Sequence, residues 1–118
     1  MALTHAQIIL WLEQCASLFE QNSDYLTDLD REIGDADHGL NMNRGFRKVL
    51  EKLPEFESQD ISSILKTTGM TLLSNIGGAS GPLFGTFFIR AAKPTASLQN
   101  LELNQLVEMV TEGVEGIV

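Results

Sequence analysis

Apolar residues recur at three- and four-residue spacing along most of this chain, and that periodicity restricts the fold more than any other feature. Residues spaced in this way share one face of an α-helix, whereas a half-buried strand alternates apolar and polar residues. No convincing alternating segment occurs in the sequence. We therefore predict an all-α fold.

Five segments carry the helical pattern, and local signals mark some of their ends. Thr4 and Gln7 have the form of a capping box, the second helix is expected to stop near Pro54, and Asp60 is a plausible cap for the third. The first stripe resumes after residues 22–24, so its helix either continues or restarts there. The apolar stripes are Ile8, Ile9, Leu12, Cys15, Ala16 and Phe19, resuming at Leu26, Leu29 and Ile33; Met42, Phe46, Val49, Leu50 and Leu53; Ile61, Ile64, Leu65, Thr68, Leu72 and Leu73; Phe84, Phe87, Phe88, Ala91 and Ala92; and Leu103, Leu106, Val107, Val110, Val114 and Ile117.

Length and charge narrow the functional classes. A chain of 118 residues is expected to form one domain, 1–118, and because the last stripe is still running at Val118 we expect that domain to be truncated at its C-terminus. A formal net charge of −8 argues against nucleic acid as a partner. No segment has the length of a membrane span or the form of a signal peptide, so we expect a cytoplasmic protein.

The lone Cys15 is expected to be a buried core thiol, and His5 is expected to be a solvent-exposed residue.

Three aspartates form the first candidate site. Asp35 and Asp37 are two residues apart in a glycine-containing loop, so both can face one ion, and Asp30 approaches from the end of the preceding helix. Oxygen ligands favour a hard cation, with Mg²⁺ the leading choice. Solvated loop residues and caps would give the same spacing, so the motif alone leaves both interpretations open. The pattern fits neither an EF-hand nor a phosphate-binding P-loop.

A glycine-rich segment at 77–81 forms the second candidate site. Ser80 can cap the following helix, and the small side chains would let backbone N–H groups approach an anion at the helix N-terminus. A plain turn between two core helices explains the same residues, and taken alone is the better explanation. His38 and Asn41 are three residues apart and could face one ligand at the start of the second helix.

Two longer blocks make the pattern specific. LDREIGDADHGLNMNRG at 29–45 and SNIGGASGPLFGT at 74–86 resemble the aspartate loop and the phosphate loop of the nucleotide-carrying L subunits of bacterial dihydroxyacetone kinases, in the same order. The resemblance covers the whole chain, although members of that family are closer to twice its length. It implies an antiparallel helical barrel whose loops at one end hold a nucleotide.

The resemblance also implies a site and a function. Asp30, Asp35 and Asp37 would coordinate two Mg²⁺ ions, and a second set of residues would contact the ADP or ATP. The chain would hold the nucleotide for phosphoryl transfer to dihydroxyacetone on a separate K subunit, with a phosphohistidine M protein of the phosphoenolpyruvate-dependent phosphotransferase system as donor. A homodimer is a further expected partner. The alternatives are an ATP-dependent dihydroxyacetone kinase domain and a non-catalytic Mg²⁺- and nucleotide-binding docking module. The residues implied to contact nucleotide are His38, Gly39, Leu40, Asn41, Ala79 and Ser80.

Overall fold

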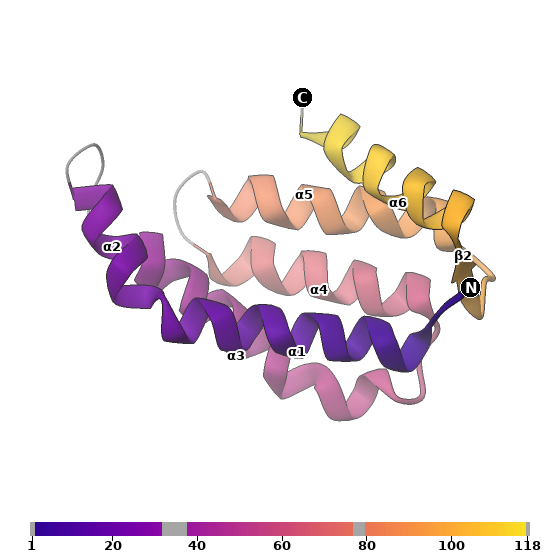
Figure 1. The fold of residues 1–118 in the computed structure, drawn as a ribbon, viewed down its shortest axis with the longest axis horizontal. Coiled ribbons are helices and arrows are strands. Elements are labelled where there is room, and N and C mark those ends of the chain that lie inside the picture. The colour runs from indigo at the N-terminus through magenta and orange to yellow at the C-terminus, as the bar shows by residue number, and fades with distance from the viewer. Residues whose placement is uncertain (1, 32–37, 77–79, 118) are drawn as a thin grey trace.

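The computed structural model describes residues 2–31, 38–76 and 80–117, which form six α-helices, one short 3₁₀ helix and one pair of short strands (Figure 1). The prediction of an all-α fold is confirmed. In chain order the elements are β1 (Ala2–Thr4), α1 (His5–Gln21), α2 (Ser23–Arg31), α3 (His38–Phe56), α4 (Ile61–Asn75), α5 (Ser80–Ala92), η1 (Lys93–Thr95), β2 (Asn100–Glu102) and α6 (Leu103–Gly116).

The long helices form an antiparallel bundle. α3 packs against α1, α2 and α4, α4 packs against α5, and α5 packs against α6. In Figure 1, α4 and α5 run side by side, α6 crosses above α5, and α2 extends α1 toward the left-hand end. The starts of α3 and α5 lie at that left-hand end, and the starts of α1 and α4 lie at the right-hand end.

The question of whether the first helix continues or restarts is settled by Asn22. Its side-chain amide and its backbone N–H both donate to the carbonyl of Leu18, at 2.8 and 3.0 Å, which ends α1. The carbonyl of Asn22 accepts from Leu26 N–H at 2.9 Å, so α2 begins at the next residue. Side-chain bonding to the local backbone is how asparagine competes with a helix.

One sequence-based expectation about the elements is wrong. A short antiparallel pair, β1 with β2, is present where no strand was predicted, with Leu3 opposite Leu101. Three-residue strands are too short for alternation to be recognised from sequence, and buried Leu101 with partly buried Leu3 attaches the pair to the core. Pro54, near which the second helix was expected to stop, lies in the last turn of α3. The helix continues to Phe56, whose fully buried ring offsets the hydrogen bond that proline cannot donate.

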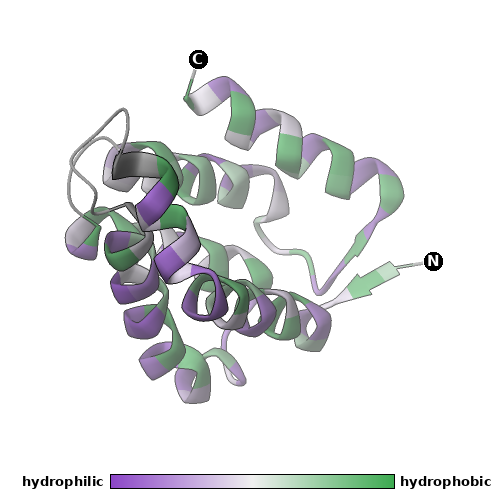
Figure 2. Cartoon of the chain, turned by 60° about the vertical axis from the view of Figure 1, so that its left-hand side comes forward, coloured by the Kyte–Doolittle hydropathy of each residue, from purple (hydrophilic) through white to green (hydrophobic). Residues whose placement is uncertain are grey.

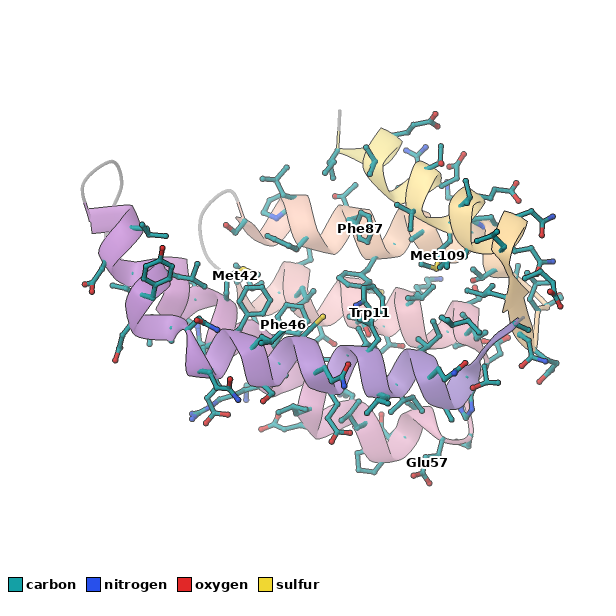
Figure 3. All side chains as sticks on the ribbon, viewed as in Figure 1. Trp11, Met42, Phe46, Glu57, Phe87 and Met109 are labelled. Carbon is teal, nitrogen blue, oxygen red and sulfur yellow. The ribbon has the colours of Figure 1, made fainter. Side chains whose placement is uncertain are left out.

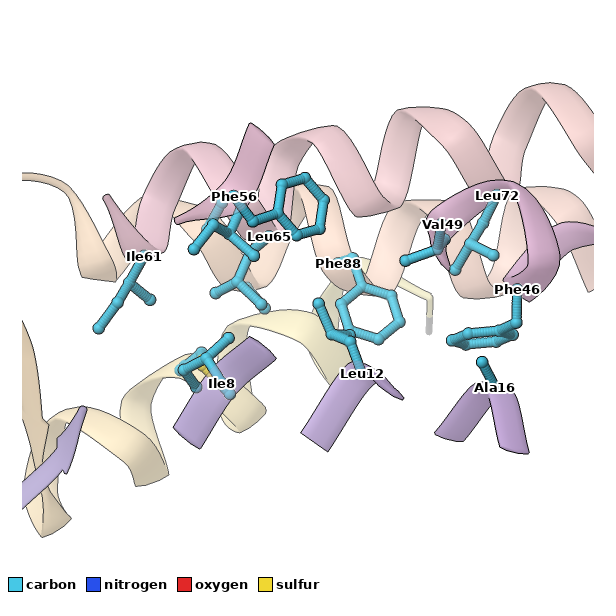
Figure 4. Packing of buried hydrophobic residues seen from close by; sticks show 14 of the residues in the cluster. Ile8, Leu12, Ala16, Phe46, Val49, Phe56, Ile61, Leu65, Leu72 and Phe88 are labelled. Carbon is cyan, nitrogen blue, oxygen red and sulfur yellow. The ribbon is translucent and has the colours of Figure 1, made fainter. Parts of the chain in front are cut away.

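One apolar core joins five of the helices. Figure 4 shows Ile8, Leu12 and Ala16 pointing from α1 toward residues of α3, α4 and α5. Hydrophobic and hydrophilic segments alternate along the helices in Figure 2, as expected where each helix buries one face. Phe19 stacks on Phe46 with ring centroids 4.9 Å apart, which ties α1 to α3. The buried apolar residues are Ile8, Leu12, Ala16, Met42, Phe46, Val49, Phe56, Ile61, Ile64, Leu65, Leu72, Ile76, Phe88, Ala91, Ala92, Leu101 and Met109.

Paired glycines allow α4 and α5 to pack closely. A Cβ on Gly69 would lie 2.7 Å from the carbonyl oxygen of Gly85, and a Cβ on Gly85 would lie 2.9 Å from that of Gly69. Gly69 weakens the intrinsic helix propensity of α4, and the contact with α5 is the structural reason for its presence.

The outer face of α6 is apolar and exposed. Leu103 is 72% exposed, and Val107, Val110, Val114 and Ile117 are also exposed. Near the end of α6, an apolar hollow of about 370 Å³ lies between α1 and α5, and Figure 3 shows Trp11 and Phe87 on its two sides. No helix in the described residues is long and apolar enough to span a membrane.

Candidate functional site

The described residues that flank the two predicted loops lie at the same end of the bundle. Ile76, which follows α4, makes the connection. A Cβ on Gly45 of α3 would lie 2.3 Å from Ile76 Cγ1, and a Cβ on Gly81 of α5 would lie 2.3 Å from the carbonyl oxygen of Ile76. Ile76 is thus in contact with α3 on one side and with the first turn of α5 on the other. We name this part of the molecule the loop end.

The predicted metal ligands lie around this end in sequence. Asp30 belongs to the last turn of α2, and α2 packs against α3. Asp35 and Asp37, together with Ala79 of the second loop, lie outside the described residues. Within the described residues no three His, Cys, Asp or Glu side chains come close enough to hold a metal ion. The magnesium assignment of Asp30, Asp35 and Asp37 therefore stays a prediction.

The start of α3 is held close to α2 by a glycine. A Cβ on Gly39 would lie 1.9 Å from the carbonyl oxygen of Ser23 and 2.8 Å from the Thr27 hydroxyl, so no larger residue fits without moving α2. His38 is the first residue of α3. Gly39 is therefore needed for packing, which is a structural role that its place in a ligand motif did not reveal.

The next two predicted contact residues differ in exposure. Leu40 is 59% exposed, whereas Asn41 is only 8% exposed and its side-chain oxygen accepts a hydrogen bond from the Arg44 guanidinium. This bond leaves the Asn41 amide N–H₂ group as the part that can donate to a ligand. Arg44 was not predicted as a site residue, and its position one turn after Asn41 is the only sequence signal for the contact.

At the start of α5, which follows the glycine-rich segment, the groups that could bind an anion are backbone N–H groups. Ser80 is the first residue of α5 and is partly buried, and Gly81 is buried against Ile76. The first turn of any α-helix has N–H groups with no intrahelical acceptor, and the helix dipole favours an anion beside them. The start of α5 is thus suited to a phosphate group, provided that Gly81 keeps its place.

A larger hollow lies at the opposite end of the bundle. It measures about 650 Å³ and is lined by residues around the starts of α1 and α4 and by Gln99 and Asn100, whereas the two hollows beside α3 measure about 500 and 380 Å³. Size does not make it the better candidate, because its lining contains neither of the two segments that the sequence marks as a site, and its two carboxylates are Glu57 and Asp60. Asp60 is moreover engaged: its carboxylate caps α4 by accepting from Ser63 N–H at 2.8 Å. Hydrogen bonding from Ser63 lowers the pKa of Asp60 below its ordinary value.

The structure also tests the expectations for His5 and Cys15. His5 is partly buried and its Nε2 lies 2.8 Å from the carbonyl oxygen of Phe56, so the expectation of a solvent-exposed residue is wrong. Because a carbonyl only accepts, Nε2 carries the proton in this bond. Cys15 is a free, partly buried thiol packed against the core, close to the expected buried thiol, and burial raises its pKa. A raised pKa disfavours the reactive thiolate.

A comparison with models of protein families shows which family the chain belongs to. The model of the DAK2 domain matches residues 32–118, which include the start of α3 and the start of α5. The chain belongs to the DAK2 domain family. Both sequence blocks that suggested a dihydroxyacetone kinase subunit overlap this DAK2 match.

Curated relatives extend the comparison. The whole chain is 61% identical to 56% of the Escherichia coli (strain K12) protein named PEP-dependent dihydroxyacetone kinase, ADP-binding subunit DhaL. It is 40% identical, over 91% of its length, to 54% of the Listeria innocua PEP-dependent dihydroxyacetone kinase 1, ADP-binding subunit DhaL. Over 80% of its length it is 32% identical to 17% of human triokinase/FMN cyclase. The chain thus spans about half the length of the bacterial relatives.

Proposed function

We propose that this chain is the nucleotide-holding part of a dihydroxyacetone kinase subunit of the phosphoenolpyruvate-dependent type. The observation that carries the proposal is its 61% identity, over every residue of the chain, to a protein named as an ADP-binding subunit of that enzyme. The meeting of α3, Ile76 and α5 at the loop end supports it, because nucleotide phosphates need donors from both segments at one place.

Magnesium is part of the proposal. Asp30, Asp35 and Asp37 would hold two Mg²⁺ ions, since carboxylate oxygens are the ligands this hard cation prefers. The chain has a net charge of −8, so a divalent cation between its carboxylates and a phosphate removes a repulsion that would otherwise oppose binding. When bound, magnesium supplies charge neutralisation at the transferring phosphoryl group.

The remaining residues of the proposed site orient the phosphates. Backbone N–H groups at Ala79 and Ser80 would donate to phosphate oxygens, and His38, Gly39 and Leu40 would border the nucleotide at the start of α3. The amide N–H₂ of Asn41 would donate as well, because Arg44 occupies its oxygen. These donors are fixed to helix starts, so little reorganisation is needed when charge develops. No nucleophile from this chain is required.

The proposed partners follow from the names of the relatives and from the resemblance. The phosphoryl donor would be a phosphohistidine M protein and the acceptor dihydroxyacetone on a K subunit, all in the cytoplasm. A second copy of the chain is a further proposed partner, and the exposed apolar face of α6 would suit it. The relation to human triokinase/FMN cyclase keeps an ATP-dependent kinase domain as the second candidate. Phosphorylation of bound ADP by the M protein separates the two.

The experiment that tests the site replaces one predicted metal ligand at a time. Asp35→Ala and Asp37→Ala are each expected to weaken Mg²⁺–ADP binding by about 100-fold or more in calorimetry, because each removes an ion ligand. Helical content by circular dichroism should stay unchanged, because the sequence predicts that both residues lie in a glycine-containing loop. Asp24→Ala, an exposed acid in the first turn of α2, is the matched control and should bind like the parent. Parental affinity in either loop variant would refute the metal assignment.

A further inference from the structure

Half of the basic residues of this acidic chain lie on one short stretch of α3. Arg44, Arg47, Lys48 and Lys52 are four of its eight Lys and Arg residues, whereas the chain as a whole has a net charge of −8. We call these four residues the basic strip. At 1.5 Å per helical residue it is about 12 Å long. Clustering of this kind creates a local positive potential on a molecule that is negative elsewhere.

The strip borders two adjoining hollows that reach the loop end. The first, of about 380 Å³, is lined by Leu40, Asn43, Arg44, Arg47, Lys48 and Glu51. The second, of about 500 Å³, lies between α3 and α4, shares Lys48 and Glu51 with the first, and extends to Asn75 at the end of α4. A partner protein that occupied both hollows would therefore also lie beside the start of α3 and the end of α4.

Within the described residues Arg44 donates to the side-chain oxygen of Asn41, whereas the ion pairs of Arg47 and Lys48 are weak. Arg47 lies 3.8 Å from Glu20 and Lys48 lies 3.6 Å from Glu51, and all four side chains are exposed, so these pairs contribute little. The side-chain oxygen of Asn43, in the first hollow, is buried and has no hydrogen-bond partner among the described residues. Cations that are loosely paired cost little to redirect toward an incoming acidic group.

Exposed apolar side chains accompany the cations. Leu40 in the first hollow and Met70 in the second are 59% and 54% exposed. Protein–protein interfaces are enriched in arginine and methionine and combine apolar contacts with charged surroundings. A nucleic acid or an anionic membrane extends far beyond 12 Å and would meet the negative remainder of the chain, whereas an acidic protein face can match the strip in size.

We propose that the basic strip, with Leu40 and Met70, is the docking surface for an acidic face of the protein that delivers the phosphoryl group. This inference rests on the proposed function, in which both the carrier and the K subunit approach the nucleotide, and of these two the carrier is the one that brings a phosphoryl group toward the cations. A phosphorylated carrier bears extra negative charge, so the same field speeds its approach. The strip and the nucleotide segment share α3, and docking on one therefore fixes the distance to the other.

Charge reversal tests the strip without touching the nucleotide residues. Arg47→Glu and Lys48→Glu should each slow association with the phosphorylated M protein by about tenfold at low ionic strength, measured by stopped flow, and the difference should shrink in high salt. Lys93→Glu, an exposed lysine of η1 with the same charge change, should stay within about twofold of the parent. Arg47→Gln should give a smaller effect than Arg47→Glu, because it removes a charge without inverting it.

Two controls separate the outcomes. Mg²⁺–ADP affinity and the melting temperature of both strip variants should equal those of the parent, so a slower association reports docking alone. Absence of nucleotide binding in the parent would defeat the proposed function, whatever the strip does. Parental association rates in both strip variants would overturn the docking proposal and leave the proposed function intact. A loss seen only with the K subunit, with nucleic acid or with anionic vesicles would overturn it equally.

Discussion

The two ends of the bundle are built differently. At the end that carries the starts of α1 and α4, side chains satisfy backbone groups: Thr4 Oγ1 accepts from Gln7 N–H at 3.2 Å, and Asp60 accepts from Ser63 N–H at 2.8 Å. We call it the capped end, and β1 and β2 also pair there. At the loop end, glycines bring backbones together, with Gly39 against Ser23 and Gly81 against Ile76.

This contrast separates stability from binding. A capping side chain satisfies one or two of the N–H groups at a helix start, and a ligand cannot then use those groups. Glycine near a helix start has no side chain that would keep an anion away from the N–H groups, so a phosphate can approach them. We infer that changes at the capped end act mainly on the free energy of unfolding, and that changes at the loop end act mainly on nucleotide affinity.

The largest effect on stability is expected at Phe56. Its ring is fully buried and its carbonyl accepts from His5, so Phe56→Ala should lower the free energy of unfolding by about 3–5 kcal/mol in urea titrations. Nucleotide affinity of the folded fraction should change less than about twofold, because the ring lies at the capped end. Phe84→Ala, a partly buried ring on α5, is the control and should cost less. An equal loss from both would show that burial does not set the cost.

An intermediate effect is expected at Gly81, and it should fall mainly on binding. Alanine normally stabilises a helix relative to glycine by about 1 kcal/mol, but a Cβ here would lie 2.3 Å from the carbonyl oxygen of Ile76. Gly81→Ala should therefore destabilise the fold by about 1–3 kcal/mol and shift Ser80, with a larger loss in Mg²⁺–ADP affinity. Gly113→Ala on α6 contacts the Phe87 ring instead, and it should affect stability without affecting binding. Unchanged nucleotide affinity in Gly81→Ala would break the comparison.

The smallest effect is expected at Asp60. Loss of its cap in Asp60→Ala should cost about 1 kcal/mol, whereas Asp60→Asn keeps a capping oxygen and should cost less. The folded-state pKa of Asp60 lies below 3.8, its ordinary value, so the carboxylate contributes stability above that pH and loses it as the pH falls through the folded-state pKa. The stability difference between the parent and Asp60→Asn should therefore shrink in denaturant titrations as the pH is lowered from 6 to 3. A difference that is constant with pH would exclude this role for the charge.

Sequence patterns anticipated the helices well because their signals are local. The capping box at Thr4 and the cap at Asp60 both occur in the structure, since each involves residues only three apart. His5 was misjudged because its partner is distant in sequence: its ring meets the carbonyl of Phe56 across 51 residues. The β1–β2 pair joins residues about 100 positions apart, and no local pattern encodes such a contact.

The candidate site was predictable in a different way. Its residues stood out because aspartates and glycines at these spacings are poor core formers, and the resemblance supplied their roles. What could not be read from sequence is spatial: the bond from Arg44 to Asn41, the fit of Gly39 against Ser23, and the role of Ile76 between α3 and α5. Each depends on how helices pack, and packing is decided by the whole core.

The central proposal is that nucleotide binds at the loop end, and a titration of the ¹⁵N-labelled chain with Mg²⁺–ADP tests it residue by residue. Backbone amide signals of Gly39, Asn41 and Ser80 are expected to shift, whereas those of Thr4 and Asp60 at the capped end should stay in place. Shifts confined to the capped end, around the larger hollow lined by His5 and Asp60, would contradict the proposal.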